Sequence, residues 1–341
     1  MAGAGALLAA GMMPARAAAL RLMSAARLGG SDGAAAWRDG ALSPVMLPGR
    51  GHAPTRLDGG KAVVMGRRPG MFGAIVDADD LSAPPRIFAP SDGNRFAGHA
   101  AFDGKQLVTA EFDAATVAAV LAARDPATGA ERTRWNLGGI EPHEVLFDRG
   151  RLFAALGGLI KDGGVAGPAF NPDGIKSEVV EVDPKSGAVL ARHGLGIQFA
   201  SLSLRHLAAG RSAMAVAAQD QDLSETRPLV ALLTDALTPL PMPSAREADF
   251  RGYIGSVAFD SSGDIVAAAS PRGGVVGFWS ASRHVFLGAL PIADGCGVAA
   301  AAESGMFWVS SGHGGLYKLS PEHIEAQWHA DAGFDHHLIT V

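Results

Sequence analysis

One pattern of polar and apolar positions recurs along the chain. Each copy starts at a histidine or at a small residue, continues through a short apolar run and a glycine-containing turn, and ends in a β-rich run. An example is Gly98-His-Ala-Ala-Phe-Asp-Gly-Lys-Gln-Leu-Val-Thr109. The marker residues of the copies are His52, His99, His143, His206, Ser256, Cys296 and His337, spaced 40 to 63 residues apart. Since a four-stranded propeller blade takes about 40–50 residues, the spacing predicts an all-β, seven-bladed β-propeller over residues 20–341.

Within a copy, turn residues separate three short apolar segments and a polar outer one. In the copy that contains His99, strands are expected around residues 106–110, 117–122 and 132–136, after the strand that follows the marker. The last two are divided by Asp125-Pro-Ala-Thr-Gly129, and a similar turn, Asp183-Pro-Lys-Ser-Gly187, follows one blade later. The longest interval contains a Gly- and Pro-rich insertion, residues 161–174, which is predicted to be a loop.

The seventh blade is expected to combine both ends of the propeller. Only four residues follow His337, enough for one inner strand, whereas residues 21–47 contain three candidate strands around Leu22, Ala34 and Pro44. Pairing these segments would close the ring and leave no sheet edge free to aggregate.

The composition fits this fold and excludes some partners. Hydrophobic residues make up 48% of the chain and charged residues 18%, with 45 Gly and 20 Pro, as suits a buried core divided by many turns. The net charge is -5 and no basic stretch interleaves with aromatic residues, so nucleic acid is not an expected partner. With a single cysteine, Cys296, the chain cannot form an internal disulfide.

The first nineteen residues have the features of a secretory signal peptide. An apolar, small-residue run ends at Pro14 and meets Ala15-Arg16-Ala17, a small-x-small cleavage pattern. A basic region is missing before this run, which resembles the middle of a twin-arginine signal; we therefore expect the true start codon to lie upstream of Met1. The mature chain is predicted to be exported to the periplasm and to contain no membrane span, because no other apolar run is long enough.

Equivalent positions of successive blades converge on one axis, so the markers should meet at one end of the central channel. This predicts a ring of five histidines, His52, His99, His143, His206 and His337, as candidate metal ligands. Loops opening on the same face add polar candidates for ligand binding, Arg68, Glu111, Gln219, Arg272 and His313, and the marker Cys296 joins them as a further candidate. Arg67 and Arg205 join Arg68 and Arg272 in favouring an anionic ligand.

Several of these segments resemble those of domain-of-unknown-function family 1513. The resemblance rests on Asn94-Arg-Phe-Ala-Gly-His99, Gly139-Ile-Glu-Pro-His-Glu144, Ser203-Leu-Arg-His-Leu207 and Asp294-Gly-Cys-Gly-Val298, and it extends from about Leu20 to Val341. It implies an exported propeller, often a twin-arginine substrate, encoded beside imelysin-type and di-haem periplasmic proteins in gene clusters linked to iron acquisition. Imelysin-type or di-haem proteins are thus the expected partners, and Fe, Cu or haem the expected cofactors. Short turns near Ala100 depart from the family pattern.

Three interpretations of the histidines remain open. In the first, each histidine binds a neighbouring blade and latches the ring, although five buried imidazoles would all need hydrogen-bond partners. In the second, they bind Fe, Cu, Zn or a haem, and the protein is an accessory of iron acquisition. In the third, the protein is a lactonase-like hydrolase in which His143 and Glu144 act as acid and base. A Ser nucleophile elbow is absent from the sequence.

Overall fold

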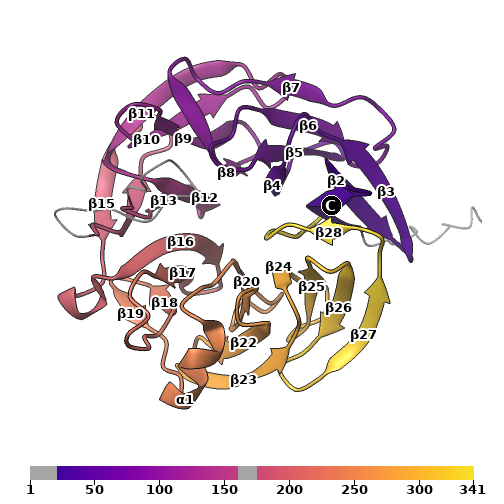
Figure 1. The fold of residues 1–341 in the computed structure, drawn as a ribbon. Coiled ribbons are helices and arrows are strands. Elements are labelled where there is room, and N and C mark those ends of the chain that lie inside the picture. Colours follow the sequence, from indigo (N-terminus) through magenta and orange to yellow (C-terminus); the bar gives the residue numbers. More distant parts are fainter. Residues whose placement is uncertain (1–20, 160–174) are drawn as a thin grey trace, which may run out of the picture.

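The computed structural model describes residues 21–159 and 175–341, and within them the chain forms seven antiparallel sheets around a central axis. Figure 1 shows the sheets following one another around the ring in chain order. The predicted seven-bladed propeller is confirmed. The predicted signal peptide, residues 1–19, and the loop predicted for residues 161–174 lie outside the described residues. No helix among the described residues is long and apolar enough to cross a membrane.

The first three complete blades follow the strand pattern expected from the repeats. Their strands are β4 (Gly51–Arg56), β5 (Lys61–Gly66), β6 (Gly73–Asp77) and β7 (Arg86–Phe88); β8 (Asn94–Phe102), β9 (Leu107–Asp113), β10 (Ala118–Arg124) and β11 (Glu131–Ile140); and β12 (Pro142–Asp148), β13 (Arg151–Leu156), β14 (Glu178–Val182) and β15 (Val189–His193). The three strands expected after the His99 marker correspond to β9, β10 and β11.

The next three blades repeat the arrangement. Their strands are β16 (Leu202–Ala209), β17 (Met214–Asp220), β18 (Val230–Leu233) and β19 (Leu237–Pro239); β20 (Ser256–Phe259), β21 (Ile265–Ser270), β22 (Val275–Ser280) and β23 (Val285–Pro291); and β24 (Gly295–Ala300), β25 (Phe307–Ser311), β26 (Gly315–Leu319) and β27 (Ile324–His329). Short helical turns at Ile197–Phe199, α1 (Ser244–Glu247) and Ala248–Phe250 lie in the connections.

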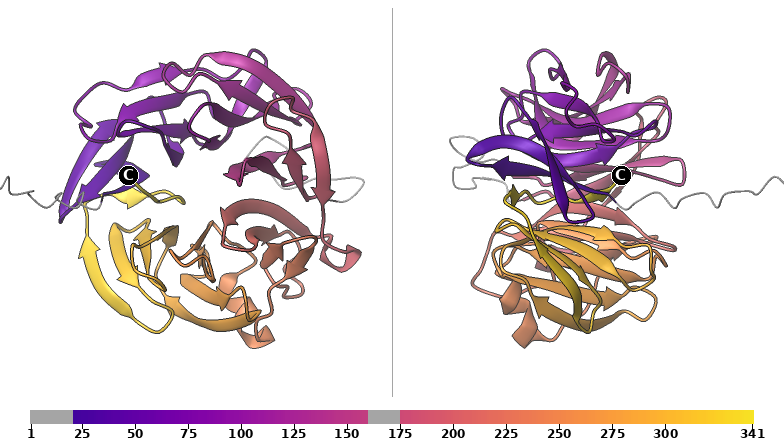
Figure 2. Two further views of the ribbon diagram at one scale, coloured as in Figure 1. Left: turned by 180° about the vertical axis from the view of Figure 1, so that it is seen from behind. Right: turned by 90° about the vertical axis from the view of Figure 1, so that its right-hand side faces the viewer.

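The closing blade combines both ends of the propeller, as predicted. The N-terminal part supplies β1 (Leu22–Leu28), β2 (Ser31–Arg38) and β3 (Ala41–Met46), and the C-terminal part supplies β28 (Gly333–Phe334) and β29 (Ile339–Thr340), both of which pair with β1. Figure 2 shows this yellow C-terminal segment lying against the indigo strands. The inner strand of this blade is interrupted, and His337 lies in the interruption.

The core consists of apolar layers between the faces of adjacent sheets. One layer joins the second and third blades through residues such as Ala110 and Leu121 on one side and Leu152 and Val180 on the other, all fully buried. Small residues are frequent in inner strands such as β8 and β24. This packing fixes each inner strand against the next and thereby sets the positions of the marker residues.

Candidate metal centre

The five marker histidines gather on the innermost strands at one end of the channel. We call them the histidine ring: His52 of β4, His99 of β8, His143 of β12, His206 of β16, and His337 between β28 and β29. The four that lie within strands sit at or beside a break in strand register, between Gly51 and Pro54, Phe96 and Ala100, Pro142 and Val145, and Leu204 and His206. A β-bulge bends its strand and turns side chains away from the regular alternation. The bulges therefore help aim the imidazoles at the axis.

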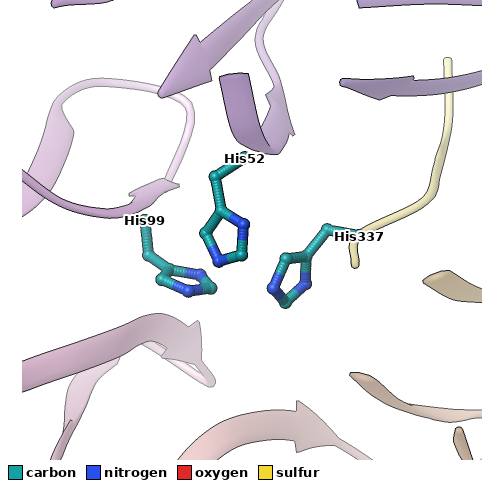
Figure 3. Close-up of side chains that lie close together, drawn as sticks. All are labelled: His52, His99 and His337. Carbon is teal, nitrogen blue, oxygen red and sulfur yellow. The ribbon is translucent and has the colours of Figure 1, made fainter. Parts of the chain in front are cut away.

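The imidazoles are in direct contact with one another. Figure 3 shows His52, His99 and His337 pointing toward a common centre from three separate segments. The His99 ring centroid lies 4.6 Å from that of His337, 5.0 Å from that of His52 and 4.9 Å from that of His143. The His206 ring centroid lies 4.9 Å from that of His143 and 5.0 Å from that of His337, which completes the ring. The sequence-predicted convergence of these residues is thus present in the structure.

Gly98 makes room for this approach. Its φ is +102°, and a Cβ atom there would lie 2.8 Å from the His52 ring. Only glycine combines that backbone conformation with so close a neighbour. The glycine before His99 consequently allows two marker histidines from adjacent blades to meet.

Burial keeps the imidazoles uncharged at neutral pH. All five ring histidines are no more than 8% exposed. Loss of solvation lowers the pKa of His52, and it lowers the pKa values of His99, His143, His206 and His337 well below the usual range. Neutral imidazole is the form that binds transition metals.

Two of the five histidines have a carboxylate partner. Nδ1 of His52 lies 2.7 Å from Oδ1 of Asp335, and Nδ1 of His206 lies 3.1 Å from Oε2 of Glu144. Although burial opposes ionisation of Asp335, its hydrogen bond to His52 and the charge of Arg67 hold the pKa of this carboxyl below its usual range. Such carboxylate–imidazole contacts fix the orientation of a ring and are typical of metal-ligating histidines.

The other three histidines each retain a free nitrogen. Nε2 of His99, Nδ1 of His143 and Nε2 of His337 are buried and have no hydrogen-bond partner among the described residues. Buried polar atoms are normally satisfied, so three exceptions within one cluster need an explanation.

The ring offers three overlapping sets of metal ligands. The sets are His52, His99 and His337; His99, His143 and His206; and Glu144, His206 and His337, each with ligand atoms within 4.8 Å of one another. Two nitrogens that bind one Zn²⁺ at its usual bond length lie at most about 4.2 Å apart. Around a tetrahedral ion the separation is about 3.4 Å, so the atoms of each set need to close by up to about 1.4 Å.

A cationic cavity adjoins the ring. This cavity, which we call the vestibule, has a volume of about 210 Å³ and is lined by His52, His143, His206 and His336, by Arg67, Arg68, Arg205 and Arg272, and by Ala97, Gln219 and Tyr253. Of the predicted ligand-binding residues, Arg68, Gln219 and Arg272 lie here. The cavity is smaller than the roughly 300–1,000 Å³ typical of pockets for drug-sized ligands. It is therefore too small to enclose a haem.

The remaining predicted ligand-binding residues lie elsewhere. Glu111 is fully buried in an ion pair with Arg124, His313 is exposed, and neither lines the vestibule. Cys296 is buried outside the vestibule lining, where loss of solvation raises the pKa of its thiol. The Ser256 hydroxyl accepts a hydrogen bond from the amide of Val298, which is a packing role.

Three further residues support the site without having been singled out from the sequence. Asp335 contacts His52, Arg50 and Arg67, while Glu141 contacts Arg68 at 2.6 Å and Arg205 at 3.1 Å. The hydroxyl of Tyr253 lies 3.1 Å from Nδ1 of His336. Asp335 and Glu141 each lie two residues before a marker histidine, and this shared spacing was the available signal.

Because the imidazoles are buried, we expect the fold to lose stability at a pH well above the range in which carboxylates usually titrate. Below about pH 6.5 the unfolded chain binds protons that the folded ring does not, so stability is present above this pH and is lost as pH falls. Each such group contributes up to about 1.4 kcal/mol per pH unit. Glu144 has the opposite effect on stability, because burial raises its pKa to about 8 and its contribution to the free energy of unfolding is lost as pH rises. This one carboxyl group is outweighed by the several imidazoles.

Urea unfolding at pH 7 and pH 5 measures this effect. We expect a clearly lower midpoint at pH 5 for the metal-free protein, and a smaller difference for His99→Leu. Equal midpoints at the two pH values would contradict the burial of neutral imidazoles.

Comparison with known proteins gives a family and a fold. The sequence model of the family described as "Protein of unknown function (DUF1513)" matches residues 45–341, and no curated protein matches the chain significantly. Kuenenia stuttgartiensis hydrazine synthase is similar in structure, with a TM-score of 0.63 at 12% identity over 86% of this chain and 90% of that one. Apo AztD from Citrobacter koseri has a TM-score of 0.56 at 10% identity, over 95% of this chain and 98% of that one. A chain of the mitotic checkpoint complex has a TM-score of 0.58 at 11% identity, over 82% of this chain and 77% of that one. Likenesses at such low identity show the fold alone.

Proposed function

The chain belongs to the DUF1513 family, and we propose that it is a periplasmic accessory protein that binds a divalent transition metal ion in the histidine ring. The family resemblance to proteins encoded with imelysin-type and di-haem proteins supports a role in iron acquisition. The ligand set, imidazoles with one adjacent carboxylate, suits Fe, Cu or Zn. The vestibule volume favours an ion over a haem.

The observation that carries this proposal is the set of three unpartnered nitrogens. His99, His143 and His337 each hold a buried nitrogen without a hydrogen-bond partner among the described residues. An ion bound between them would satisfy these lone pairs, and the low pKa values mean that few protons need to be displaced.

A purely structural role accounts for only part of the ring. His52 and His206 do link separate segments through Asp335 and Glu144, as a latch requires. A latch would leave the nitrogens of His99, His143 and His337 buried and unsatisfied, whereas the same two carboxylates also fit the role of orienting metal ligands.

Metal titration of the protein tests the proposal. The protein is stripped with a chelator and titrated with Zn²⁺, Cu²⁺ and, without oxygen, Fe²⁺, followed by metal analysis of the separated protein. We expect one tightly bound ion per chain. The double variant His143→Ala/His337→Ala should lose at least about 100-fold in affinity, since even changes to groups behind the ligands cost 10–100-fold.

The control is His323→Ala, which removes an exposed histidine outside the ring. It should bind the ion as the wild type does. If the wild-type protein binds no ion and the double variant is only less stable, the histidines are latches and the proposal is wrong.

Glu144 favours a second candidate function, metal-assisted hydrolysis of an ester or lactone. Burial raises its pKa to about 8, which places a proton-exchanging group beside His206 near neutral pH. With a bound ion activating water, Glu144 and the neutral His143 would act as acid and base. Turnover of lactones by the metal-loaded protein, lost in Glu144→Gln when the rate is expressed per bound metal ion, would support this candidate.

A further inference from the structure

The vestibule carries more positive than negative charge. Four arginines line it, Arg67, Arg68, Arg205 and Arg272, whereas their carboxylate partners among the described residues are only Glu141 and Asp335, and Asp335 is shared with Arg50. Glu144, beside His206, is the other carboxyl group in contact with the ring. Even if it is counted as ionised, the guanidinium groups are in excess.

Arg272 contributes a charge that is held in place but not neutralised. Its guanidinium lies 4.4 Å from the centre of the Tyr253 ring, and no carboxylate among the described residues pairs with it. The Tyr253 hydroxyl is in turn fixed by Nδ1 of His336. This stacking orients the guanidinium against the vestibule and leaves it able to bind an anion.

Arg205 supplies a second, independent sign of a missing partner. It is the extra residue of the bulge between Leu204 and His206, and it is only 5% exposed. One guanidinium nitrogen contacts Glu141 at 3.1 Å, but Nε has no hydrogen-bond partner among the described residues. A buried, charged donor without an acceptor is rare in folded proteins. An oxyanion in the vestibule is the kind of group that would satisfy it.

We propose that the vestibule is a binding site for a small oxyanion, a carboxylate or a phosphate, held chiefly by Arg205, Arg272 and Gln219. The cavity of about 210 Å³ suits an anion of a few heavy atoms. Planar guanidinium groups match the oxygens of carboxylate and phosphate groups, and the Gln219 amide can donate a further hydrogen bond.

The position of the site couples it to the histidine ring. His52, His143 and His206 line the same cavity, so a bound anion lies next to a metal ion in the ring. The arginine charges repel a bare cation, and an anion beside it removes this repulsion. Anion and metal should therefore bind with positive coupling, which is reciprocal. The coupling rests on the proposed function, whereas the oxyanion site does not.

Calorimetric titration with succinate and with inorganic phosphate, two weakly chelating probes, tests both the oxyanion site and its coupling to the metal. The wild-type protein is titrated in the chelator-stripped form and after loading with Zn²⁺. We expect one of the two anions to bind, with an affinity that rises on metal loading. Arg272→Gln should weaken its binding about tenfold or more, because a charge-assisted hydrogen bond is lost. Arg86→Gln, at an exposed arginine of β7 outside the vestibule, should not.

The outcomes separate the two sites. Binding of neither anion to either form, or equal binding to wild type and Arg272→Gln, would overturn the oxyanion site. Binding of an anion to a protein that takes up no metal would leave this site standing and end the proposed function. Metal binding that is unchanged by the anion would overturn the coupling. Selective binding of succinate identifies the ligand as a carboxylate, and of phosphate as a phosphate.

Discussion

Replacing Glu111 with alanine should lower the free energy of unfolding by about 3–5 kcal/mol. The Glu111 side chain is fully buried, and its carboxylate accepts hydrogen bonds from Arg124 at 2.5 Å, from the Thr109 hydroxyl and from the Asn94 amide. Without it, the charge of Arg124, which is 2% exposed, stays buried with no counter-ion. Chemical denaturation of the metal-free variant and wild type measures the difference.

The double variant Glu111→Leu/Arg124→Leu is the matched control. Because it removes both charges together, it should recover most of the loss, as replacement of a buried pair by apolar groups is often close to neutral. Metal binding should be unchanged in both variants, since Glu111 does not line the vestibule. A large drop in metal affinity for Glu111→Ala at unchanged stability would instead place Glu111 in the binding site.

The contrast between Glu111 and the ring histidines shows how far the repeat phase can be used. The phase fixes which backbone positions face the axis, because every blade repeats the same path, and this placed His52, His99, His143, His206 and His337 together from the sequence. For Glu111 the repeat phase predicts only the strand on which the residue lies. What the side chain contacts depends on Arg124, a partner on the neighbouring strand that the pattern of the markers does not identify.

The carboxylates that orient the ring show a second limit. Asp335 reaches His52 across 283 residues of sequence, and this contact exists only because the closing blade brings the end of the chain beside the first complete blade. The sequence predicted that closure but not its register. The bulges beside the markers are likewise local departures from regular pairing, which an averaged strand pattern does not reveal.

Removing residues 338–341 should unfold the chain at room temperature or convert it into oligomers. This segment contains β29, whose Ile339 and Thr340 pair with Met23 and Leu22, and it contains Leu338, which is 5% exposed. Gly297 of β24 lies so close to this segment that a Cβ atom there would lie 2.6 Å from the Leu338 amide nitrogen. Without β29, the part of the β1 edge at Leu22 and Met23 is open to pair with another chain. Size-exclusion chromatography and circular dichroism report the two outcomes.

Two point variants calibrate this deletion. Leu338→Ala keeps the backbone pairing and should lose about 2–5 kcal/mol of stability while remaining monomeric like the wild type, because it creates a cavity without opening an edge. Leu190→Ala, at a side chain that is 58% exposed, should change stability by no more than about 0.5 kcal/mol. If the deletion behaved like Leu338→Ala, the pairing of β29 with β1 would contribute little, and closure would depend on side-chain packing alone. If the deleted protein instead exposes β1, adding a peptide of the C-terminal sequence should restore the wild-type elution volume, since it supplies the missing strand.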